Sequence, residues 1–266
     1  MNCLHLSLHD YSSKMIGIVG GVGPYAGLDL AKNVFDNTIA ATDQDHLPVM
    51  MLSHSATILD RTEYLLGQIK INPGKAIAEV ILRLEKAGAT VAGIPCNTAH
   101  EESIFGLTKK VLAEYNSRIH LLNMVDETVA ALKAQYPEIK HVGILSTTGT
   151  WKFGVYAQPL VAAGFTPVAL KAEEQTGLVH PAIYDKKYGI KAKSNPVTNK
   201  AREDLLAAIL QLKEKGAELI IKGCTEIALA IPEKIVEGVH SLDPSIVLAR
   251  SLIRTINPKK LKIIES

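Results

Sequence analysis

The amino-acid sequence predicts an α/β protein made of two similar halves, each with a parallel sheet flanked by helices. The first observation is a gapless internal repeat, in which residues 81–97 (ILRLEKAGATVAGIPCN) match residues 209–225 (ILQLKEKGAELIIKGCT). Each copy reads as an amphipathic helix, a glycine cap, a short apolar strand and a cysteine. A shorter repeat supports it, since residues 17–23 and 143–149 both change from an apolar strand to a turn of small residues. Thirdly, strand and helix patterns alternate along the chain, which is typical of parallel sheets.

The predicted elements follow this alternation from Met15, where the first convincing strand begins and which could itself be an alternative start. Strands are expected at 15–19, 47–52, 90–94, 119–124, 141–145, 167–170 and 219–222. In the first half, helices are expected from 24 to about 37, from 74 to the glycine cap at 88, and between residue 100 and about 115. In the second half they are expected at 127–134, between 150 and the strand at 167, from after 196 to the glycine at 216, and at 242–256. The polar segment 171–199 is expected to be irregular, and a loop of that length is usually functional or mobile.

Composition argues against several function classes. The chain has 266 residues, of which 47% are hydrophobic, so it is long enough for two cored domains. Its net charge is +2, and without a basic run among aromatics no nucleic-acid partner is expected. No apolar run has the roughly 18 residues of a membrane span, and residues 1–14 do not read as a signal peptide. A cytoplasmic protein without membrane contact is therefore expected. Three cysteines make no disulfide framework, and Cys3 is interpreted as incidental.

Cys96 and Cys224 are the strongest candidates for catalysis. Each is predicted at the carboxyl end of a parallel strand, where ligands bind, and just before a helix, whose N-terminus favours a thiolate. Hydrogen-bonding residues follow both, namely Asn97 and Thr98 after the first and Thr225 after the second. A single cysteine is usually a small buried hydrophobe, but two in equivalent places favour a functional pair. No metal is expected, because no Cys-x-x-Cys or His-x-x-x-His spacing supplies further zinc ligands.

The glycine turn at 20–24 has two interpretations. It fits a dinucleotide-binding pattern, but the second predicted strand ends without the acidic residue that holds a ribose, so no nicotinamide cofactor is expected. An anion cradle for a carboxylate is favoured instead. Arg61, in a loop after that strand, could clamp a carboxylate with two hydrogen bonds, or it could be an ordinary surface arginine. His54 and His100 lie near strand ends, where a supporting or surface position is more common than a role as base.

Four motifs occur in order along the chain: GIVGGVGP at 17–24, DRT at 60–62, PCNTAH at 95–100 and GCTEI at 223–227. Together they resemble the aspartate/glutamate racemase family, and within it the cofactor-independent aspartate racemases. The resemblance covers the chain from about Met15 to its end. It implies two pseudo-symmetric Rossmann-like domains with the active site in the cleft between them, and often a homodimer. The expected division is 15–122 together with 226–266 as one domain, and 123–225 as the other.

The resemblance also implies roles for single residues. Cys96 and Cys224 would be the two acid/base groups, while Arg61 and Lys191 would contact the carboxylates of a small acidic amino acid. We therefore expect interconversion of L- and D-aspartate, or of glutamate, by a two-base mechanism without pyridoxal phosphate or any other cofactor. Asn97, Thr98 and Thr225 would help to stabilise the charge that develops in the reaction.

Other functions stay open on the sequence alone. The same scaffold could isomerise maleate, racemise a hydantoin or, with one critical cysteine, decarboxylate an arylmalonate. A non-catalytic protein that binds amino acids could also keep this fold. The thiol pair argues against such a binding protein, since binding alone needs no second cysteine.

Overall fold

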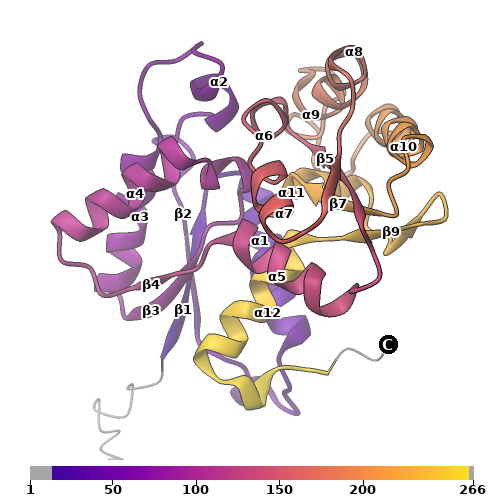
Figure 1. Cartoon of the computed structure of the whole chain (residues 1–266). Coiled ribbons are helices and arrows are strands. Elements are labelled where there is room, and N and C mark those ends of the chain that lie inside the picture. The colour runs from indigo at the N-terminus through magenta and orange to yellow at the C-terminus, as the bar shows by residue number, and fades with distance from the viewer. Residues whose placement is uncertain (1–13, 264–266) are drawn as a thin grey trace, which may run out of the picture.

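The computed structural model describes residues 14–263 and shows two lobes, each built on its own sheet (Figure 1). The first sheet is entirely parallel and has the order β2-β1-β3-β4, with β1 (Met15–Gly20), β2 (Val49–Ser53), β3 (Ala89–Gly93) and β4 (His120–Leu121). The second sheet has the order β6-β5-β7-β9-β8, with β5 (His141–Ser146), β6 (Thr166–Val168), β7 (Leu219–Gly223), β8 (Ile235–Val236) and β9 (Val239–Leu242). Its pairs are parallel except β8 with β9. The predicted fold class is confirmed.

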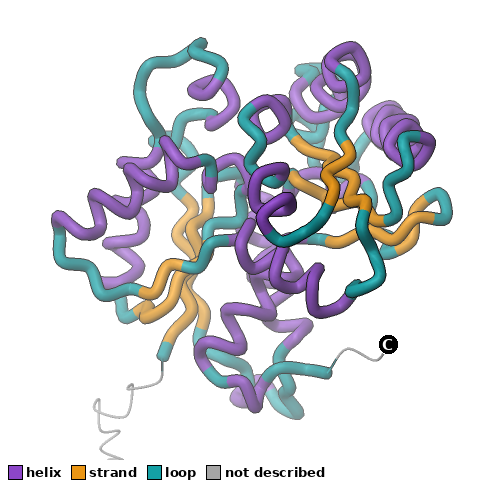
Figure 2. Tube along the Cα trace, viewed as in Figure 1, coloured by secondary structure: helices purple, strands orange, loops and turns teal. Residues whose placement is uncertain are grey.

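Helices cover both faces of each sheet (Figure 2), so four apolar clusters form the cores. The longer helices are α1 (Pro24–Asn37), α3 (Gly74–Lys86), α4 (Glu102–Glu114), α5 (Met124–Gln135), α10 (Asn199–Glu214) and α12 (Pro244–Ile256). The shorter ones are α2 (Arg61–Leu65), α6 (Thr148–Lys152), α7 (Ala157–Ala162), α8 (Ala172–Glu174), α9 (His180–Tyr184) and α11 (Thr225–Ala230). Single turns complete the set, namely η2 (Asp43–Asp45), η3 (Asn97–His100), η5 (Pro258–Lys260) and the π-helical η4 (Gln175–Val179).

The internal repeat becomes two matching helix–strand units, α3–β3 and α10–β7. Both helices end before a glycine in the left-handed region, Gly88 with φ +107° and Gly216 with φ +92°. Only glycine adopts such angles without strain, so the predicted glycine caps are the residues that end these helices and turn the chain into its strand. Each unit then delivers its cysteine directly beyond the strand, Cys96 after β3 and Cys224 after β7.

The C-terminal part of the chain contributes to both lobes. The antiparallel hairpin β8–β9, which the sequence did not predict, extends the second sheet. α12 then packs on the first sheet beside α1, where Leu248 and Leu252 share an apolar cluster with Ile16 and Leu30. In Figure 1 this yellow helix lies below the junction of the lobes. The division into 15–122 with 226–266, and 123–225, stays a prediction, but sheet membership differs from it for residues 235–242.

The segment 171–199 is not irregular throughout, which corrects the prediction. Its first part runs through α8, η4 and α9 as a continuous helical stretch, and Val179, Ala182 and Ile183 bury their side chains in the core of the second lobe. The π turn inserts an extra residue per turn and shifts the apolar positions, which hides the 3.6-residue period that identifies a helix. Arg61 also differs from the prediction, because it is the first residue of α2 rather than part of a loop.

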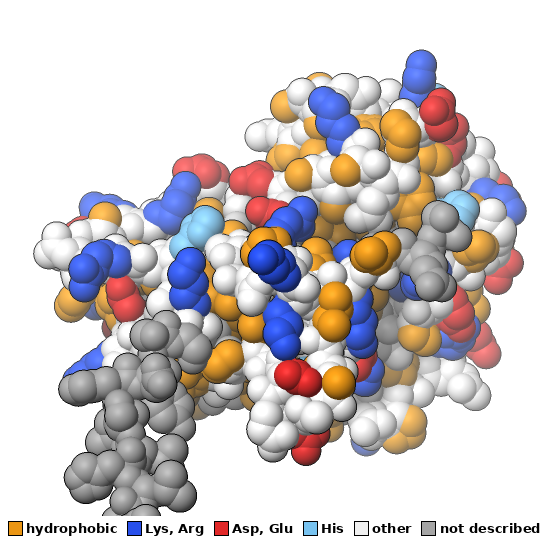
Figure 3. All heavy atoms as spheres, turned by 90° about the horizontal axis from the view of Figure 1, so that it is seen from below, with side chains coloured by type: hydrophobic (Ala, Val, Ile, Leu, Met, Phe, Trp, Pro, Cys, Tyr) orange, Lys and Arg blue, Asp and Glu red, His pale blue; other side chains and the backbone are white. Residues whose placement is uncertain are grey.

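The surface has no marked charge segregation on the face seen from below. Figure 3 shows Lys and Arg side chains interspersed with acidic and hydrophobic ones on that face. Within residues 14–263, no helix has the length and apolar character needed to cross a membrane. In the same range, His, Cys, Asp and Glu side chains form no group of three or more that could hold a metal ion.

Candidate active site

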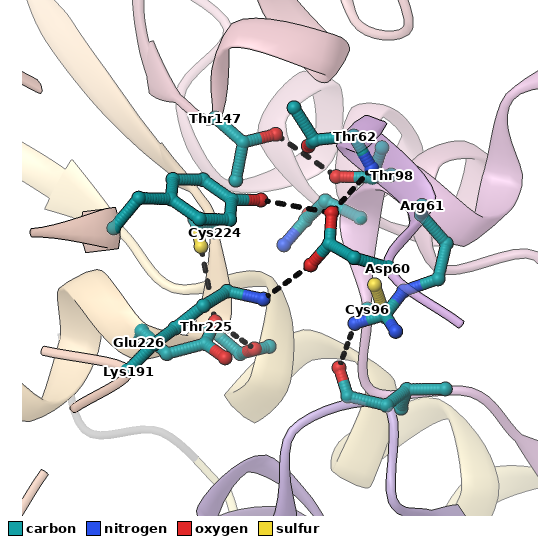
Figure 4. Close-up of a pocket in the computed structure, with 13 residues that line it drawn as sticks. Asp60, Arg61, Thr62, Cys96, Thr98, Thr147, Lys191, Cys224, Thr225 and Glu226 are labelled. Atoms are coloured by element: carbon teal, nitrogen blue, oxygen red, sulfur yellow. Dashed lines mark hydrogen bonds and ion pairs between the residues drawn. The ribbon is translucent and has the colours of Figure 1, made fainter. Parts of the chain in front are cut away.

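A small cavity lies where the carboxyl ends of β3 and β7 face each other between the lobes (Figure 4). All seven residues that the sequence proposed for the site line this cavity: Arg61, Cys96, Asn97, Thr98, Lys191, Cys224 and Thr225. Six more lining residues had no role in the sequence-based site: Val22, Asp60, Thr62, Thr147, Tyr184 and Glu226. The cavity has a volume of only about 10 Å³, room for about one water molecule. We call it the thiol cavity.

The two thiols occupy equivalent positions. Cys96 is the N-cap residue of η3 and Cys224 that of α11, and both have extended backbone angles. Their exposed fractions are 7% and 5%, and neither forms a disulfide. The parallel strands set this geometry, because a strand that ends at the cleft must place the next residue on its wall. The charged neighbours of the two thiols are, however, of opposite sign.

Cys224 faces a carboxylate. Its Sγ donates a hydrogen bond to Glu226 Oε2 at 3.0 Å, and Thr225 Oγ1 donates to the same oxygen at 3.1 Å. Burial raises the pKa of Cys224 well above its ordinary value, and the Glu226 charge raises it further. Burial would also raise the pKa of Glu226, but Lys191 and the thiol hydrogen bond outweigh it and lower the pKa. The pair is therefore a neutral thiol beside an ionised carboxylate.

Gly23 makes room for this carboxylate. A Cβ atom at position 23 would come within 2.6 Å of Glu226 Oε1, and the glycine has φ +139°. The glycine turn of the first lobe thus accommodates a carboxylate from the second half of the chain. Only a residue without a Cβ atom allows this close approach.

Cys96, in contrast, lies beside the guanidinium of Arg61 (Figure 4). Arg61 is only 6% exposed, and its Nη1 and Nη2 donate to the carbonyl oxygens of Leu59 at 3.1 Å and Val22 at 2.6 Å. Burial would lower the pKa of Arg61, but the Cys96 side chain and the Asp60 carboxylate raise it above its ordinary value. Arg61 is thus a permanent cation, and backbone carbonyls already take part of the fork that the sequence assigned to a substrate.

Asp60 and Lys191 form an ion pair between the lobes. Lys191 Nζ lies 2.9 Å from Asp60 Oδ2, and the side chains are 27% and 19% exposed. Asp60 Oδ1 also accepts from the backbone N–H groups of Thr62 and Glu63, which caps α2. Burial alone would raise the pKa of Asp60, but Lys191 and Arg61 lower it to about 2. The Lys191 ammonium, which lines the thiol cavity, is therefore already paired with an internal carboxylate.

A second cavity, of about 250 Å³, adjoins the first. Gly21, Gly23, Pro24, Tyr25, Ile58 and Ser194 line it, together with four residues that also line the thiol cavity: Asp60, Arg61, Lys191 and Glu226. These four charged side chains stand between the two spaces. We call the outer space the vestibule. The glycine turn and the start of α1 line it, which is where the sequence predicts an anion cradle.

Unpartnered polar atoms concentrate at the thiol cavity. Among the described residues, five buried side-chain nitrogen or oxygen atoms have no hydrogen-bond partner, and three belong to cavity residues: Arg61 Nε, Thr62 Oγ1 and Asn97 Nδ2. Buried polar groups are nearly always paired in folded proteins. Their clustering around a small polar cavity is what a site for a polar ligand requires.

His100 supports the loop that carries Cys96. Its Nδ1 lies 2.9 Å from the Cys96 carbonyl oxygen, and its Nε2 accepts from the Met124 N–H at 3.2 Å. Burial lowers the pKa of His100 to about 4, so the ring is neutral near pH 7. His100 does not line the thiol cavity, in agreement with a supporting role; His54 bonds to Thr57 nearer the surface.

Comparison with known proteins shows the family of the chain. The family model described as Asp/Glu/Hydantoin racemase matches residues 19–252. The broad specificity amino-acid racemase RacX of Bacillus subtilis (strain 168) is 24% identical over 247 residues, which cover 91% of this chain and 97% of that protein.

Solved structures of similar proteins also match nearly the whole chain. The aspartate racemase of Picrophilus torridus has a TM-score of 0.76 and 28% identity, and the match covers 94% of this chain and 96% of that one. An aspartate racemase homologue from Pyrococcus horikoshii OT3 has a TM-score of 0.67 and 22% identity over 91% of this chain and 99% of that one. The second likeness shows the fold alone. From the family match, the chain belongs to the Asp/Glu/hydantoin racemase family, whose racemases are isomerases.

Proposed function

We propose that the protein is a cofactor-independent racemase that interconverts L- and D-aspartate, and glutamate less efficiently, with Cys96 and Cys224 as its two bases. The observation that carries the proposal is the placement of two free thiols at equivalent strand ends on the wall of one cavity. Inversion at Cα requires a base on one face of the carbon and an acid on the other. Two facing thiols supply both groups without a covalent intermediate.

The charges beside the two thiols favour Cys96 as the base and Cys224 as the acid in one direction of the reaction. Arg61 places a positive charge beside Cys96, whereas Glu226 places a negative charge beside Cys224 and keeps the proton on it. In one direction the Cys96 thiolate removes the α-proton and the Cys224 thiol delivers its proton to the opposite face. Cys96 is then the thiol and Cys224 the thiolate, and the reverse reaction starts from that state.

The α-proton is weakly acidic, so the developing negative charge must be stabilised. The unpartnered Asn97 Nδ2 and Arg61 Nε can donate hydrogen bonds into the cavity, and the hydroxyls of Thr98 and Thr225 also line it. Preorganised donors in a site without bulk water give the largest stabilisation of such charge. The small volume of the cavity implies that the lobes must open to admit substrate and close before the proton transfers.

The cations support an acidic amino acid as the substrate. Arg61 and Lys191 line the thiol cavity and the vestibule alike, so a substrate with two carboxylates can meet both. Similarity to the Picrophilus torridus aspartate racemase favours aspartate. Similarity to a racemase of broad specificity extends the set of amino acids to be assayed.

Incubation of L-aspartate with the protein in deuterium oxide tests this function. We expect deuterium at Cα, measured by NMR, and loss of optical rotation at the same time. A Cys96→Ala, Cys224→Ala double variant should show neither effect and controls for contaminating enzymes. If aspartate binds without exchange, the protein is a binding protein; if glutamate and a hydantoin also remain unchanged, the racemase proposal is wrong.

We further propose a homodimer in the cytoplasm. An exposed apolar stripe on α1 supports the dimer, since Tyr25, Leu28 and Phe35 are 42%, 53% and 40% exposed. Side chains of this kind on one helix face are typical of an interface between subunits. The location follows from the mechanism, which requires both thiols to stay reduced, as they do in the cytoplasm.

A further inference from the structure

Tyr156 is a buried residue of the second lobe that reaches the site from behind its lining. It precedes α7, its exposed fraction is 0%, and it does not line the thiol cavity. We propose that Tyr156 is a positioning residue, which fixes the side-chain amide of Asn97 so that the NH2 group points at a carboxylate of the bound substrate. The proposal rests on the racemase function and adds a specific role for a residue that never touches the substrate.

The hydrogen bonds of the Asn97 amide show a division between its two ends. Tyr156 Oη donates to Asn97 Oδ1 at 2.5 Å. The other end, Nδ2, is buried and has no partner, although Asn97 is only 1% exposed and lines the thiol cavity. A side-chain amide carries an acceptor oxygen and a donor nitrogen on opposite ends. Because Tyr156 is hydrogen-bonded to the acceptor Oδ1, the donor Nδ2 remains available to a ligand in the thiol cavity.

The opposite orientation of the amide would hinder binding. Rotated by half a turn, Oδ1 would face the cavity and repel both a substrate carboxylate and a thiolate at Cys96. The Asn97 NH2 would then face Tyr156 Oη. Burial raises the pKa of Tyr156 above its ordinary value, so the phenol keeps its proton throughout the working range and remains a donor. A neutral hydroxyl can also accept from an NH2 group, so Tyr156 anchors the amide, and negative charge in the cavity selects the orientation that leaves the NH2 group inward.

The contact also crosses between the lobes, because Asn97 follows β3 of the first sheet and Tyr156 follows α6 of the second lobe. A second set of contacts crosses between the lobes at the next residue, where Thr98 Oγ1 lies 2.9 Å from both Thr147 Oγ1 and Thr150 Oγ1. These threonines hold the lobes together without the phenol. Removal of the hydroxyl of Tyr156 alone should therefore leave the fold intact and release only the amide.

The test is a double-mutant cycle with Tyr156→Phe and Asn97→Ala, read from KM and kcat for L-aspartate and from the Kd of aspartate by calorimetry. Tyr156→Phe should raise KM and Kd about tenfold, the effect of one hydrogen bond of about 1.4 kcal/mol. kcat should also fall, because the Asn97 amide helps to stabilise the negative charge that develops during the proton transfer. In the Asn97→Ala background the same substitution should have no further effect, since no amide is left to orient.

Asn97→Asp provides a second reading. Tyr156 would hold one carboxylate oxygen and the other would face the cavity, so this variant should bind aspartate more weakly than Asn97→Ala does. Tyr64→Phe is the matched control, because it removes a hydroxyl that accepts from Asn72 at 3.1 Å away from the thiol cavity. It should leave KM and Kd unchanged.

Each outcome decides the proposal. Equal effects of Tyr156→Phe in both backgrounds, or a loss of kcat alone, would mean that the phenol acts through packing and would overturn it. If the wild-type protein binds aspartate without exchange or inversion, the racemase function fails while the cycle in Kd still decides the role of Tyr156. A wild-type protein that binds no aspartate overturns both.

Discussion

Cys224 and Glu226 form a buried thiol–carboxylate pair, with Sγ donating to Oε2 at 3.0 Å. At the equivalent position of the first lobe, Cys96 has the guanidinium of Arg61 as its neighbour. The backbone repeat therefore places two like thiols in two unlike electrostatic environments. This asymmetry has a direct consequence for the pH dependence of activity.

Glu226→Gln should shift the alkaline limb of the kcat/KM profile to lower pH. In the proposed mechanism that limb reports loss of the proton from the acid thiol, and the Glu226 charge, together with burial, raises the pKa of Cys224. Without the charge, the proton leaves Cys224 at a lower pH and the active range narrows from the alkaline side. Glu214→Gln, at an exposed position of α10, is the control. An unchanged alkaline limb in Glu226→Gln would show that Cys224 is not the group that titrates there.

Cys96→Ala and Cys224→Ala should each abolish racemisation, measured by circular dichroism or polarimetry. Each single variant keeps one thiol, so in deuterium oxide each should exchange the α-proton of one enantiomer without inversion. Cys96→Ala should need a higher pH to do so, because burial and the Glu226 charge raise the pKa of its remaining thiol, Cys224. The two variants should select opposite enantiomers, because the remaining thiols approach opposite faces of Cα. Cys3→Ala is the matched control and should retain full activity; Cys3 lies outside the described residues. Near wild-type racemisation by either single variant would exclude a two-base mechanism.

Arg61→Lys keeps the charge but loses the planar fork and its hydrogen bonds to two backbone carbonyls. We expect kcat/KM for aspartate to fall about 10- to 100-fold, the range for a lost hydrogen bond to a charged group. Alanine, if it is accepted, should lose much less, because it has no side-chain carboxylate. Equal losses for both substrates would show that Arg61 serves Cys96 rather than the second carboxylate.

Asp60→Asn should tighten the binding of aspartate by about two- to fivefold, the range for a partly exposed ion pair. An asparagine at position 60 still caps α2. It no longer competes with a substrate carboxylate for Lys191, whose Nζ lies 2.9 Å from Asp60 Oδ2 in the wild-type protein. Isothermal calorimetry measures the change in Kd. Lys191→Met should have the opposite effect. Weaker binding by Asp60→Asn would contradict a competitive role of the ion pair.

Leu28→Asp should convert the proposed dimer into a monomer, observed by light scattering after gel filtration. Leu28 is 53% exposed at the centre of the stripe on α1, and a buried unpaired carboxylate strongly destabilises an interface. Leu210→Asp is the matched control, since Leu210 is 40% exposed on the other lobe. If both variants keep the mass of the wild-type protein, the stripe on α1 is not the interface.

The sequence was sufficient to predict the elements that repeat. Cys96 and Cys224 converge because each follows a helix, a glycine cap and a parallel strand, and these local signals survive in the folded protein. Sequence spacing could not show the hairpin β8–β9, whose strands have only two and four residues. The helical stretch of 171–199 was missed because the π turn breaks its apolar period.

The sequence analysis missed several residues of the site, each for a different reason. Glu226 could have been found, because an acidic residue two positions after Cys224 lies in the first turn of α11. The pairing of Asp60 with Lys191 joins residues 131 positions apart and depends on how the lobes dock. Tyr156 carries no signal of its own, because a buried tyrosine is common in a core and only its contact with Asn97 gives it a role.

The unequal neighbours of Cys96 and Cys224 cannot favour one product. Enantiomers in water have equal free energies, so a racemase obeys a Haldane relation in which kcat/KM is the same in both directions. Any preference that Arg61 and Glu226 create for one protonation state must then appear as matched differences in kcat and KM, which cancel in the ratio. The charges around the thiols thus set which enantiomer saturates the enzyme first, while the final mixture stays fixed by the substrate alone.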